Sequence, residues 1–390
     1  MGVERIYLDA NATTPVLPEV VAAMLPYFSE QAGNPSATHQ SGQRTRSAVE
    51  RARKAVAALL HASPKEIVFT SGGTESNNAA LFGVLQPYLD RHEPAHLITT
   101  ATEHHAVLYP AEVLAGRGIE VTFLQPAADG RVSPEALSAA MRPHTRLLSV
   151  MLANNETGTV QPLGKLARIA KAHNTQLLVH TDAVQAAGKL PLDLSGEFKN
   201  VDLLSISGHK LYAPQGTGAL FVRQGIQLTP LLHGGPHERQ RRAGTENVPG
   251  IVALGSAATM AVTWLEDDGP QRLAALRDRL ETGLLAAVPG SQVNGSAEHR
   301  LPNTTNLRLD GVDAEALLIA LDMQGIAASF GAACQSGATE PSHVLLAMGL
   351  SPAEARSSLR LSLSRLTTAE EIDRSLEIIP AVVERLRALA

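Results

Sequence analysis

Residues 176–222 read QLLVHTDAVQAAGKLPLDLSGEFKNVDLLSISGHKLYAPQGTGALFV. Three short apolar runs in this stretch, QLLVHT (176–181), DLLSIS (202–207) and GALFV (218–222), are continuous rather than alternating. Strands that are covered on both faces of a sheet have this pattern. We therefore predict that the three runs are strands of a sheet that lies between layers of helices.

The same pattern extends over most of residues 45–225. Helical patterns lie between several of the runs; in residues 43–60, for example, apolar residues recur at helical spacing. Strands that alternate with helices predict an α/β domain with a largely parallel sheet. The other predicted strands are EIVFT (66–70), HLITT (96–100), EVTFL (120–124) and RLLSVML (146–152).

The sequence changes in character after about residue 260, which places a domain boundary near 255–265. A helical region at 269–287 begins this second part. SSLRLSLSR (357–365) alternates strictly, as a strand with one polar face does. The last helix is predicted to begin near Thr368, because Glu371 follows three positions later and can complete a capping box.

The composition is ordinary for a soluble globular protein of 390 residues, with 44% hydrophobic and 18% charged residues. The net charge of −5 does not favour a surface that binds nucleic acid, because phosphate binding needs net or clustered positive charge. Cys334 is the only cysteine, so no internal disulfide can form.

Neither a secretory signal nor a membrane span is predicted. The N-terminus, MGVERIYLDANATTP (1–15), lacks a basic start followed by an apolar run. The longest mostly apolar stretch, IVALGSAATMAVTWL (251–265), is short for a span and contains small polar residues, so we expect a buried helix. We expect a cytoplasmic protein that contacts neither membrane nor nucleic acid directly.

Several polar clusters follow the ends of predicted strands, where ligands bind in open α/β sheets. In VFTSGGTESNN (68–78) a strand leads into a glycine turn, and a helix opens near Thr74. Free backbone N–H groups at such a helix start suit a phosphate, although an ordinary glycine turn has the same sequence pattern. The cluster lacks the lysine of a nucleotide P-loop.

Two further clusters place His104 in TEHHAV (102–107) and Asn155 in NNETG (154–158) after strands. A lone histidine is more often structural than catalytic, and Asn155 either binds a ligand or belongs to an ordinary turn. His233 and His237 are four positions apart, but the intervening Gly-Gly-Pro prevents one helical face from presenting both, so no metal site is expected.

Asp182 and Lys210 carry the strongest chemical signal. Asp182 ends a strongly apolar strand, where a carboxylate needs a partner; the protonated pyridine nitrogen of pyridoxal phosphate is a suitable one. Lys210, in SISGHKLYAPQGTG (205–218), is either a surface lysine or a Schiff-base lysine. The second interpretation is favoured because groups for phosphate, pyridine and ring stacking occur at neighbouring strand ends.

The ordered motifs resemble those of the class V aminotransferase group of pyridoxal-phosphate enzymes, and within it the cysteine desulfurases of the NifS/IscS-like group. The resemblance extends from YLDANATTP (7–15) to LTTAEEID (366–373) and rests on TSGGTESNN, TEHHAV, NNETG, HTDAVQ, SGHKLYAPQG, RRAGTENVPG, FGAACQSG and SSLRLSLSR. It implies the fold of type I pyridoxal-phosphate-dependent transferases. A large cofactor-binding domain over 16–260 and a smaller α/β domain over 1–15 and 261–390 are then expected, the latter with a mobile cysteine loop at about 329–341.

The resemblance also implies roles for the site residues. Lys210 would form the Schiff base with the cofactor and move the Cα proton, and Asp182 would pair with the pyridine N–H. His104 would stack on the ring and take part in proton transfer. Gln185 and Asn155 would hold the O3′ side of the ring. The phosphate would be bound by Gly73, Thr74, Ser207 and His209, with Thr245 reaching it across a homodimer interface.

Arg360 has support of its own, because it is the one large residue on a face of small serines and is free to bind a carboxylate bidentately. The resemblance makes it the residue that binds the substrate carboxylate, with Asn34 and Asn155 nearby. Cys334 would then attack the sulfur of L-cysteine as a thiolate, release L-alanine and keep the sulfur as a persulfide.

Two other functions stay open at this stage. One is a class V aminotransferase or lyase that does not use Cys334, including a selenocysteine lyase; the other is a non-catalytic sulfur-relay or binding protein on the same fold. Phe330 and Ala332 stand where related enzymes often have serine, and Gln335 replaces a common threonine. A sulfur-acceptor protein is expected, and it belongs to an iron–sulfur scaffold, a tRNA-thiolation relay or a DNA-phosphorothioation system.

Overall fold

The computed structural model describes residues 5–331 and 340–389. Its centre is a seven-stranded sheet in the order β2-β8-β7-β6-β5-β3-β4. The strands are β2 (Ile67–Thr70), β3 (His96–Thr100), β4 (Glu120–Leu124), β5 (Thr145–Ser149), β6 (Leu178–Asp182), β7 (Leu203–Ser207) and β8 (Gly218–Val222). Every strand predicted from the sequence in this region is present. β8 alone runs antiparallel to its neighbours β2 and β7, so the sheet is mixed and mostly parallel.

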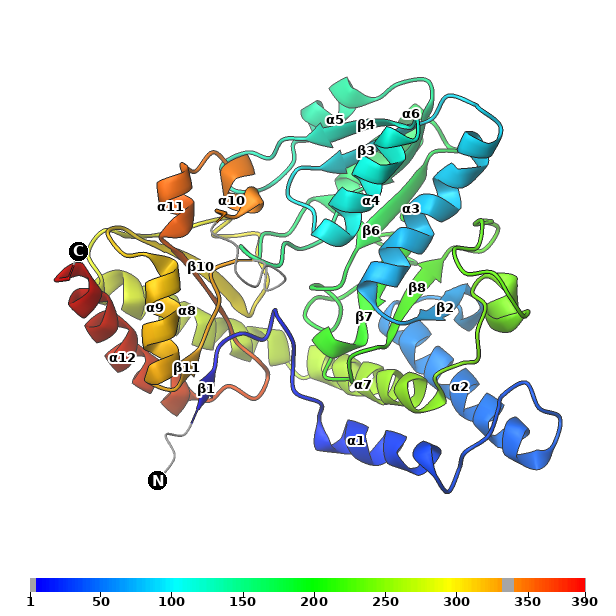
Figure 1. The fold of residues 1–390 in the computed structure, drawn as a ribbon, viewed down its shortest axis with the longest axis horizontal. Helices are drawn as coiled ribbons and strands as arrows, with labels where there is room; N and C mark the ends of the chain where they lie inside the picture. Colours follow the sequence, from blue (N-terminus) through cyan, green and yellow to red (C-terminus); the bar gives the residue numbers. More distant parts are fainter. Residues whose placement is uncertain (1–4, 332–339, 390) are drawn as a thin grey trace.

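Helices cover both faces of this sheet (Figure 1). One face packs against α3 (Gly73–Asp90) and α4 (His105–Gly116), and the other against α2 (Gln40–Leu59), α6 (Leu163–His173) and α7 (Val248–Glu266). Successive strand residues point to opposite faces. Leu147 therefore packs in the apolar cluster that includes α3 and α4, and Leu148 in the cluster that includes α2, α6 and α7. Burial on both sides explains the continuous apolar runs.

Helix α7 contains the longest apolar stretch of the sequence. Among the described residues it is the one helix that is long and apolar enough to cross a membrane by length and composition, and half of its most apolar window is buried within the protein. It packs against α2 and α1 (Pro18–Met24). This packing accounts for its apolar sequence as that of a helix in the protein core.

A second group of elements is built on a three-stranded antiparallel sheet in the order β12-β10-β9, with β9 at Ser291–Val293, β10 at Thr304–Leu309 and β12 at Ser358–Ser362. The helices around it are α8 (Gly269–Ala287), α9 (Ala314–Met323) and α12 (Ala369–Arg387). Two short helices, α10 (His343–Ala347) and α11 (Pro352–Arg356), precede β12. The remaining short helix, α5 (Pro134–Ala140), belongs with the elements around the seven-stranded sheet. Thr368 caps α12 through a capping box with Glu371, as the sequence predicts.

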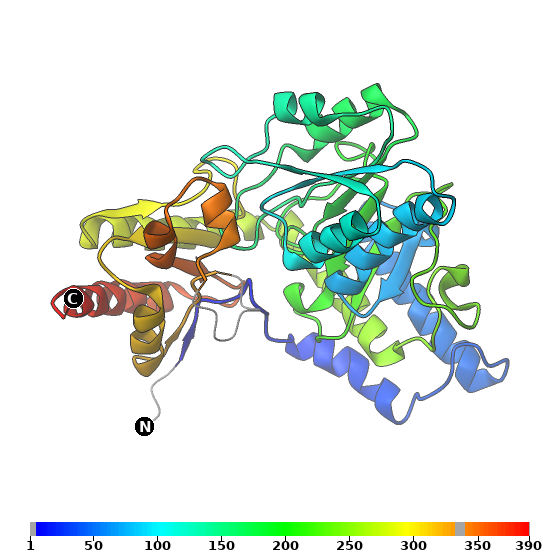
Figure 2. The same ribbon diagram turned by 45° about the horizontal axis from the view of Figure 1, so that its top comes forward.

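The N-terminal segment crosses to this second group (Figures 1 and 2). Strand β1 (Ile6–Tyr7) pairs in parallel with β11 (Ile326–Ala327), and the side chains of Ile6 and Leu8 belong to the same apolar cluster as those of α8, β10, β12 and α12. The chain then returns to the large sheet through residues 9–15. The domain limits given above stay a prediction, but this path brings residue 9 and β12 beside the ends of the large sheet.

Candidate active site

A cavity of about 200 Å³ lies where β6 and β7 end, between the two groups of elements. Residues far apart in the sequence line it, from Asn11 near the N-terminus to Arg360 on β12. The sequence-predicted residues that line this cavity are Gly73, Thr74, His104, Asn155, Asp182, Gln185, Ser207, His209, Lys210 and Arg360. The structure therefore brings together in one place the polar clusters that follow the strand ends.

Asp182 is the last residue of β6, and only 5% of it is exposed. Its Oδ2 accepts a hydrogen bond from Asn77 Nδ2 at 2.6 Å, and its Oδ1 accepts one from the backbone N–H of Val184 at 2.9 Å. These donors hold the carboxylate at the cavity wall. Asn77 Oδ1 is buried without a hydrogen-bond partner, which leaves an acceptor at the same wall.

Lys210 ends a short 3₁₀ turn, Gly208–Lys210, that follows β7 directly. Its Nζ donates to the backbone oxygen of Ala12 at 2.5 Å and also to that of Asn11. Two carbonyl oxygens thus hold the amine against the returning N-terminal segment.

His104 caps helix α4, because its Nδ1 accepts a hydrogen bond from the backbone N–H of Ala106 at 3.0 Å. A ring nitrogen that accepts from an N–H carries no proton, so any proton of the neutral ring is on Nε2. Burial lowers the pKa of His104, Asp182 opposes this shift, and Lys210 and His343 reinforce it. The ring is therefore neutral and faces the cavity that Asp182 and Lys210 also line.

The start of α3 also lines the cavity, and there Gly72 supplies no side-chain cap. The first N–H groups of a helix lack intrahelical partners, so they are available to an anion. A Cβ at Gly73 would lie 2.7 Å from Val184 Cγ2, and one at Gly218 would lie 2.6 Å from Gly72 Cα. Glycine at these positions is what allows the start of α3 to approach the strand ends.

His209 lines the same cavity, and its Nδ1 is 3.2 Å from Thr13 Oγ1. Burial lowers its pKa to about 4, with further lowering by the cations of Lys210 and Lys189. His209 is therefore a neutral ring that can donate or accept one hydrogen bond near neutral pH.

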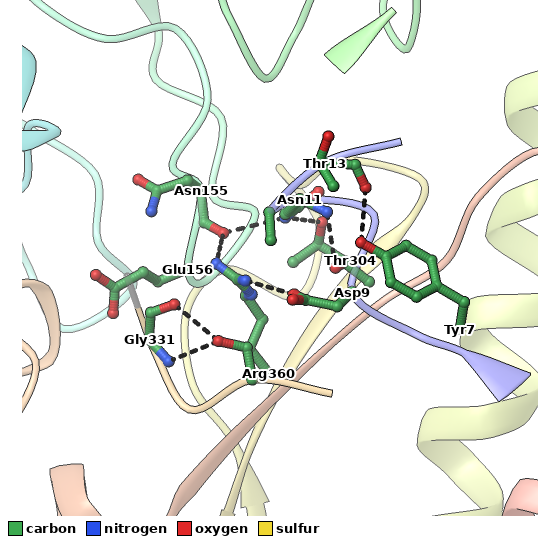
Figure 3. A network of polar contacts seen from close by, with 12 residues as sticks. Tyr7, Asp9, Asn11, Thr13, Asn155, Glu156, Thr304, Gly331 and Arg360 are labelled. Atoms are coloured by element: carbon green, nitrogen blue, oxygen red, sulfur yellow. Dashed lines mark hydrogen bonds and ion pairs between the residues drawn. The ribbon is translucent and has the colours of Figure 1, made fainter. Parts of the chain in front are cut away.

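Arg360 lies on β12 and is 1% exposed (Figure 3). Its Nη2 donates to Asp9 Oδ1 at 2.6 Å and its Nη1 to the backbone oxygen of Asn155 at 3.1 Å, while its Nε has no hydrogen-bond partner. The alternating strand predicted at 357–365 is present, but all of β12 is buried, so its polar face points into the protein. A buried guanidinium with donors left over suits a small carboxylate.

Two predicted residues among those that the structure describes, Asn34 and Thr245, do not line this cavity. Asn34 and Thr245 are both exposed, and Asn34 Oδ1 accepts a hydrogen bond from the backbone N–H of Ser36 at 2.9 Å. Cys334 and most of its predicted loop lie outside the described residues. Asn11 and Asn77, in contrast, line the cavity although no role was assigned to them; each stands inside a recognised motif, which was the available signal.

The donors and acceptors fit pyridoxal phosphate. A carboxylate, an uncapped helix start, an amine and a neutral imidazole all line the same cavity. These groups match a pyridine nitrogen, a phosphate, an aldehyde carbon and an aromatic ring, respectively. Within residues 5–331 and 340–389, no three His, Cys, Asp or Glu side chains are grouped as a metal site would require.

Comparisons with known proteins agree with the motifs and the fold. A cysteine desulfurase IscS of Methanosarcina thermophila is 48% identical over 387 residues, which cover 99% of this chain and 94% of that protein. A solved NifS-like protein is 37% identical with a TM-score of 0.91, covering 98% of this chain and 100% of that one. A structure of SspA in complex with cysteine is 36% identical with a TM-score of 0.81, covering 93% and 99% of the two chains.

These similarities confirm the family resemblance and the fold class predicted from the sequence. The family model described as Aminotransferase class-V matches residues 6–375. The chain belongs to the class V aminotransferase family.

Proposed function

We propose that this protein is a pyridoxal-phosphate-dependent cysteine desulfurase, which converts L-cysteine to L-alanine and keeps the sulfur as a persulfide on Cys334. The observation that carries the proposal is the convergence of Lys210, Asp182, His104 and Arg360 on one cavity. Relatives named cysteine desulfurase, 46–50% identical over nearly the whole chain, support the same activity.

Each residue of the cavity has a distinct task. When bound, the cofactor supplies an electron sink for the substrate carbon. Asp182 keeps the pyridine nitrogen protonated, and Lys210 holds the cofactor covalently and later moves the Cα proton of the substrate. The neutral His104 ring packs on the cofactor ring, and Arg360 binds the substrate carboxylate through the donors that Asp9 and Asn155 leave free.

The cysteine-bearing segment begins next to Arg360. The backbone N–H of Arg360 donates to the Ser329 oxygen at 2.6 Å, and the N–H of Ser329 donates back at 3.2 Å. Cys334 follows five positions later, and five residues span at most about 18 Å. The thiolate of Cys334 attacks the substrate sulfur, so that an S–S bond forms and the C–S bond breaks. The carbon that loses sulfur is protonated to give L-alanine.

We place the enzyme in the cytoplasm as a homodimer, in which the exposed Thr245 reaches the phosphate site of the second subunit. Arg242, three positions earlier, pairs with Glu75 in the first turn of α3, which ties this segment to the cofactor end of its own subunit. The persulfide passes to an acceptor protein that serves iron–sulfur cluster assembly or thiolation.

Incubation with L-cysteine tests the activity directly. We expect alanine to form and the peptide that contains Cys334 to gain the mass of one sulfur atom. Cys334→Ala should lose both products and keep the absorption of bound cofactor. Full turnover by Cys334→Ala would instead support a class V aminotransferase or lyase that does not use this cysteine. The same variant can be given L-selenocysteine. If Cys334→Ala releases selenium from L-selenocysteine faster than it releases sulfur from L-cysteine, a selenocysteine lyase is favoured.

A further inference from the structure

Lys189 is a buried lysine to which the proposed chemistry assigns no task. It lies in the segment that follows β6, four residues after Gln185, and is 7% exposed. Its Nζ donates to Gln185 Oε1 at 2.8 Å and lies 3.5 Å from Asn11 Oδ1. Gln185 and Asn11 line the cavity, whereas Lys189 stands behind them. A buried ammonium is costly unless it is hydrogen-bonded, so its position calls for a reason.

The hydrogen bonds of Lys189 determine which way the Gln185 amide faces. Lys189 Nζ donates to Gln185 Oε1, so the atom of Gln185 that faces Lys189 is the oxygen. The amide nitrogen of Gln185 then points the other way and donates to the backbone oxygen of Asn11 at 3.0 Å. An amide NH₂ has two hydrogens, and the second is left for a group in the cavity.

The backbone oxygen of Asn11 connects this amide to the proposed catalytic lysine. It accepts hydrogen bonds from both Gln185 Nε2 and Lys210 Nζ. Lys189, Gln185, Asn11 and Lys210 therefore form one continuous chain of hydrogen bonds along the cavity wall. A change at Lys189 can reach the cofactor side through this chain without direct contact.

We propose that Lys189 is a positioning residue that turns the NH₂ of Gln185 toward the ring oxygen of the bound cofactor. The inference rests on the proposed function, because it takes the ring oxygen to lie beside Gln185. Without Lys189, the Gln185 amide can rotate. Its oxygen would then face the ring oxygen of the cofactor, and the two oxygens would repel each other. A donor to the ring oxygen stabilises its anionic form, so this donor lowers the pH at which the bound cofactor loses its proton.

The surroundings of Lys189 favour a role through its hydrogen bonds rather than through its charge, because burial and nearby cations oppose its protonated form. Burial lowers its pKa to about 7, with smaller lowering by the cations of Lys210 and Arg360. Lys189 in turn helps to lower the pKa of His209. The described groups that act on Lys189 electrostatically are thus cations, and its polar contacts are the amide oxygens of Gln185 and Asn11.

The test is the pH midpoint of the visible absorption change of the bound cofactor, measured on the purified holoenzyme without substrate. Lys189→Met should raise this midpoint by about one pH unit, the size of one lost hydrogen bond. Lys189→Gln keeps a neutral donor, so its midpoint should rise less than that of Lys189→Met. The matched control is Lys171→Met, which removes a lysine that pairs with Asp202 at 2.6 Å and does not line the cavity.

A double-mutant cycle separates positioning through Gln185 from a direct effect of charge. In a Gln185→Met background, Lys189→Met should cause no further shift, because the amide that it orients is gone. Additive shifts would overturn the proposal in favour of a direct charge effect. An unchanged midpoint in Lys189→Met, or in Lys189→Gln if the first variant does not fold, would also overturn it. Wild-type protein that binds no cofactor would refute the proposed function as well, so the two failures are distinguishable.

Discussion

Asp9 Oδ1 accepts a hydrogen bond from Arg360 Nη2 at 2.6 Å, and the two residues are 351 positions apart in the sequence. Asp9 follows β1, whereas Arg360 lies in the middle of β12. The contact joins the N-terminal segment to the strand that carries the proposed substrate-binding arginine. It also neutralises a guanidinium that the fold removes from water almost completely.

Asp9→Asn should lower the free energy of unfolding by about 1–3 kcal/mol, because Arg360 would keep an acceptor and lose its compensating charge. Urea denaturation of the holoenzyme measures the change. The control is Asp322→Asn, which removes the partner of Arg5 in an exposed ion pair and should cost less than about 1 kcal/mol. Equal losses of unfolding free energy in the two variants would show that burial gives the Asp9–Arg360 pair no greater effect on stability than an exposed ion pair has.

Arg360→Gln should lower kcat/KM for L-cysteine about a hundredfold or more, mainly through KM, since two charge-assisted hydrogen bonds to the carboxylate are lost. The cofactor absorption should persist, because no predicted cofactor contact is removed. Steady-state alanine production gives the constants. Arg308→Gln is a suitable control, since Arg308 lies on the neighbouring strand β10 and pairs with Asp310 and Glu354 instead. A KM unchanged by Arg360→Gln would remove the arginine from substrate binding.

Gly73→Ala should weaken cofactor binding tenfold or more. The new Cβ would come within 2.7 Å of Val184 Cγ2 and would push the start of α3 away from the phosphate side of the cavity. Titration of the apoprotein with pyridoxal phosphate, followed by absorption, measures the affinity. Gly116→Ala at the end of α4 is the control, because no atom lies within 4 Å of its Cβ position. It should leave both cofactor affinity and stability unchanged or slightly improved.

Glu103 makes the stability of the protein depend on pH. Burial raises its pKa to about 8, and Asp182 adds to the rise, although its hydrogen bonds from Met151 N–H and Thr100 oppose it. Folded Glu103 therefore keeps a proton that the unfolded chain releases above its usual pKa of 4.5. Unfolding releases this proton between the two values, so the free energy of unfolding falls as pH rises from about 4.5 to about 8.

Glu103→Gln should remove this contribution, because the amide keeps the acceptor for Met151 and does not titrate. Between pH 4.5 and about 8, the free energy of unfolding of the variant should fall less steeply with pH than that of the wild type. The difference in slope should be up to about 1.4 kcal/mol per pH unit. Urea denaturation at several pH values compares the two slopes. Parallel curves for wild type and variant would show that Glu103 does not hold a proton in the folded protein.

Local patterns of residues were enough to predict the strands, the turn and the cap that follow from them. Strands covered on both faces need continuous apolar runs, so all strands of the large sheet were predictable, as were the glycine turn before α3 and the cap at Thr368. Asp182 and Lys210 were recognisable because each follows such a strand directly. The roles of Asn34, Thr245 and Cys334 stay predictions, with Cys334 outside the described residues.

Which polar groups meet could be established from the folded chain alone. Asn77 reaches Asp182 across 105 positions, Arg360 reaches Asp9, and Lys189 turns toward Gln185 rather than toward solvent. A local pattern encodes whether a segment is buried, but the partner of a buried polar group lies wherever packing of distant segments places it. Buried charges require such partners, so the pairs that shape this cavity appear only once the two groups of elements have packed together.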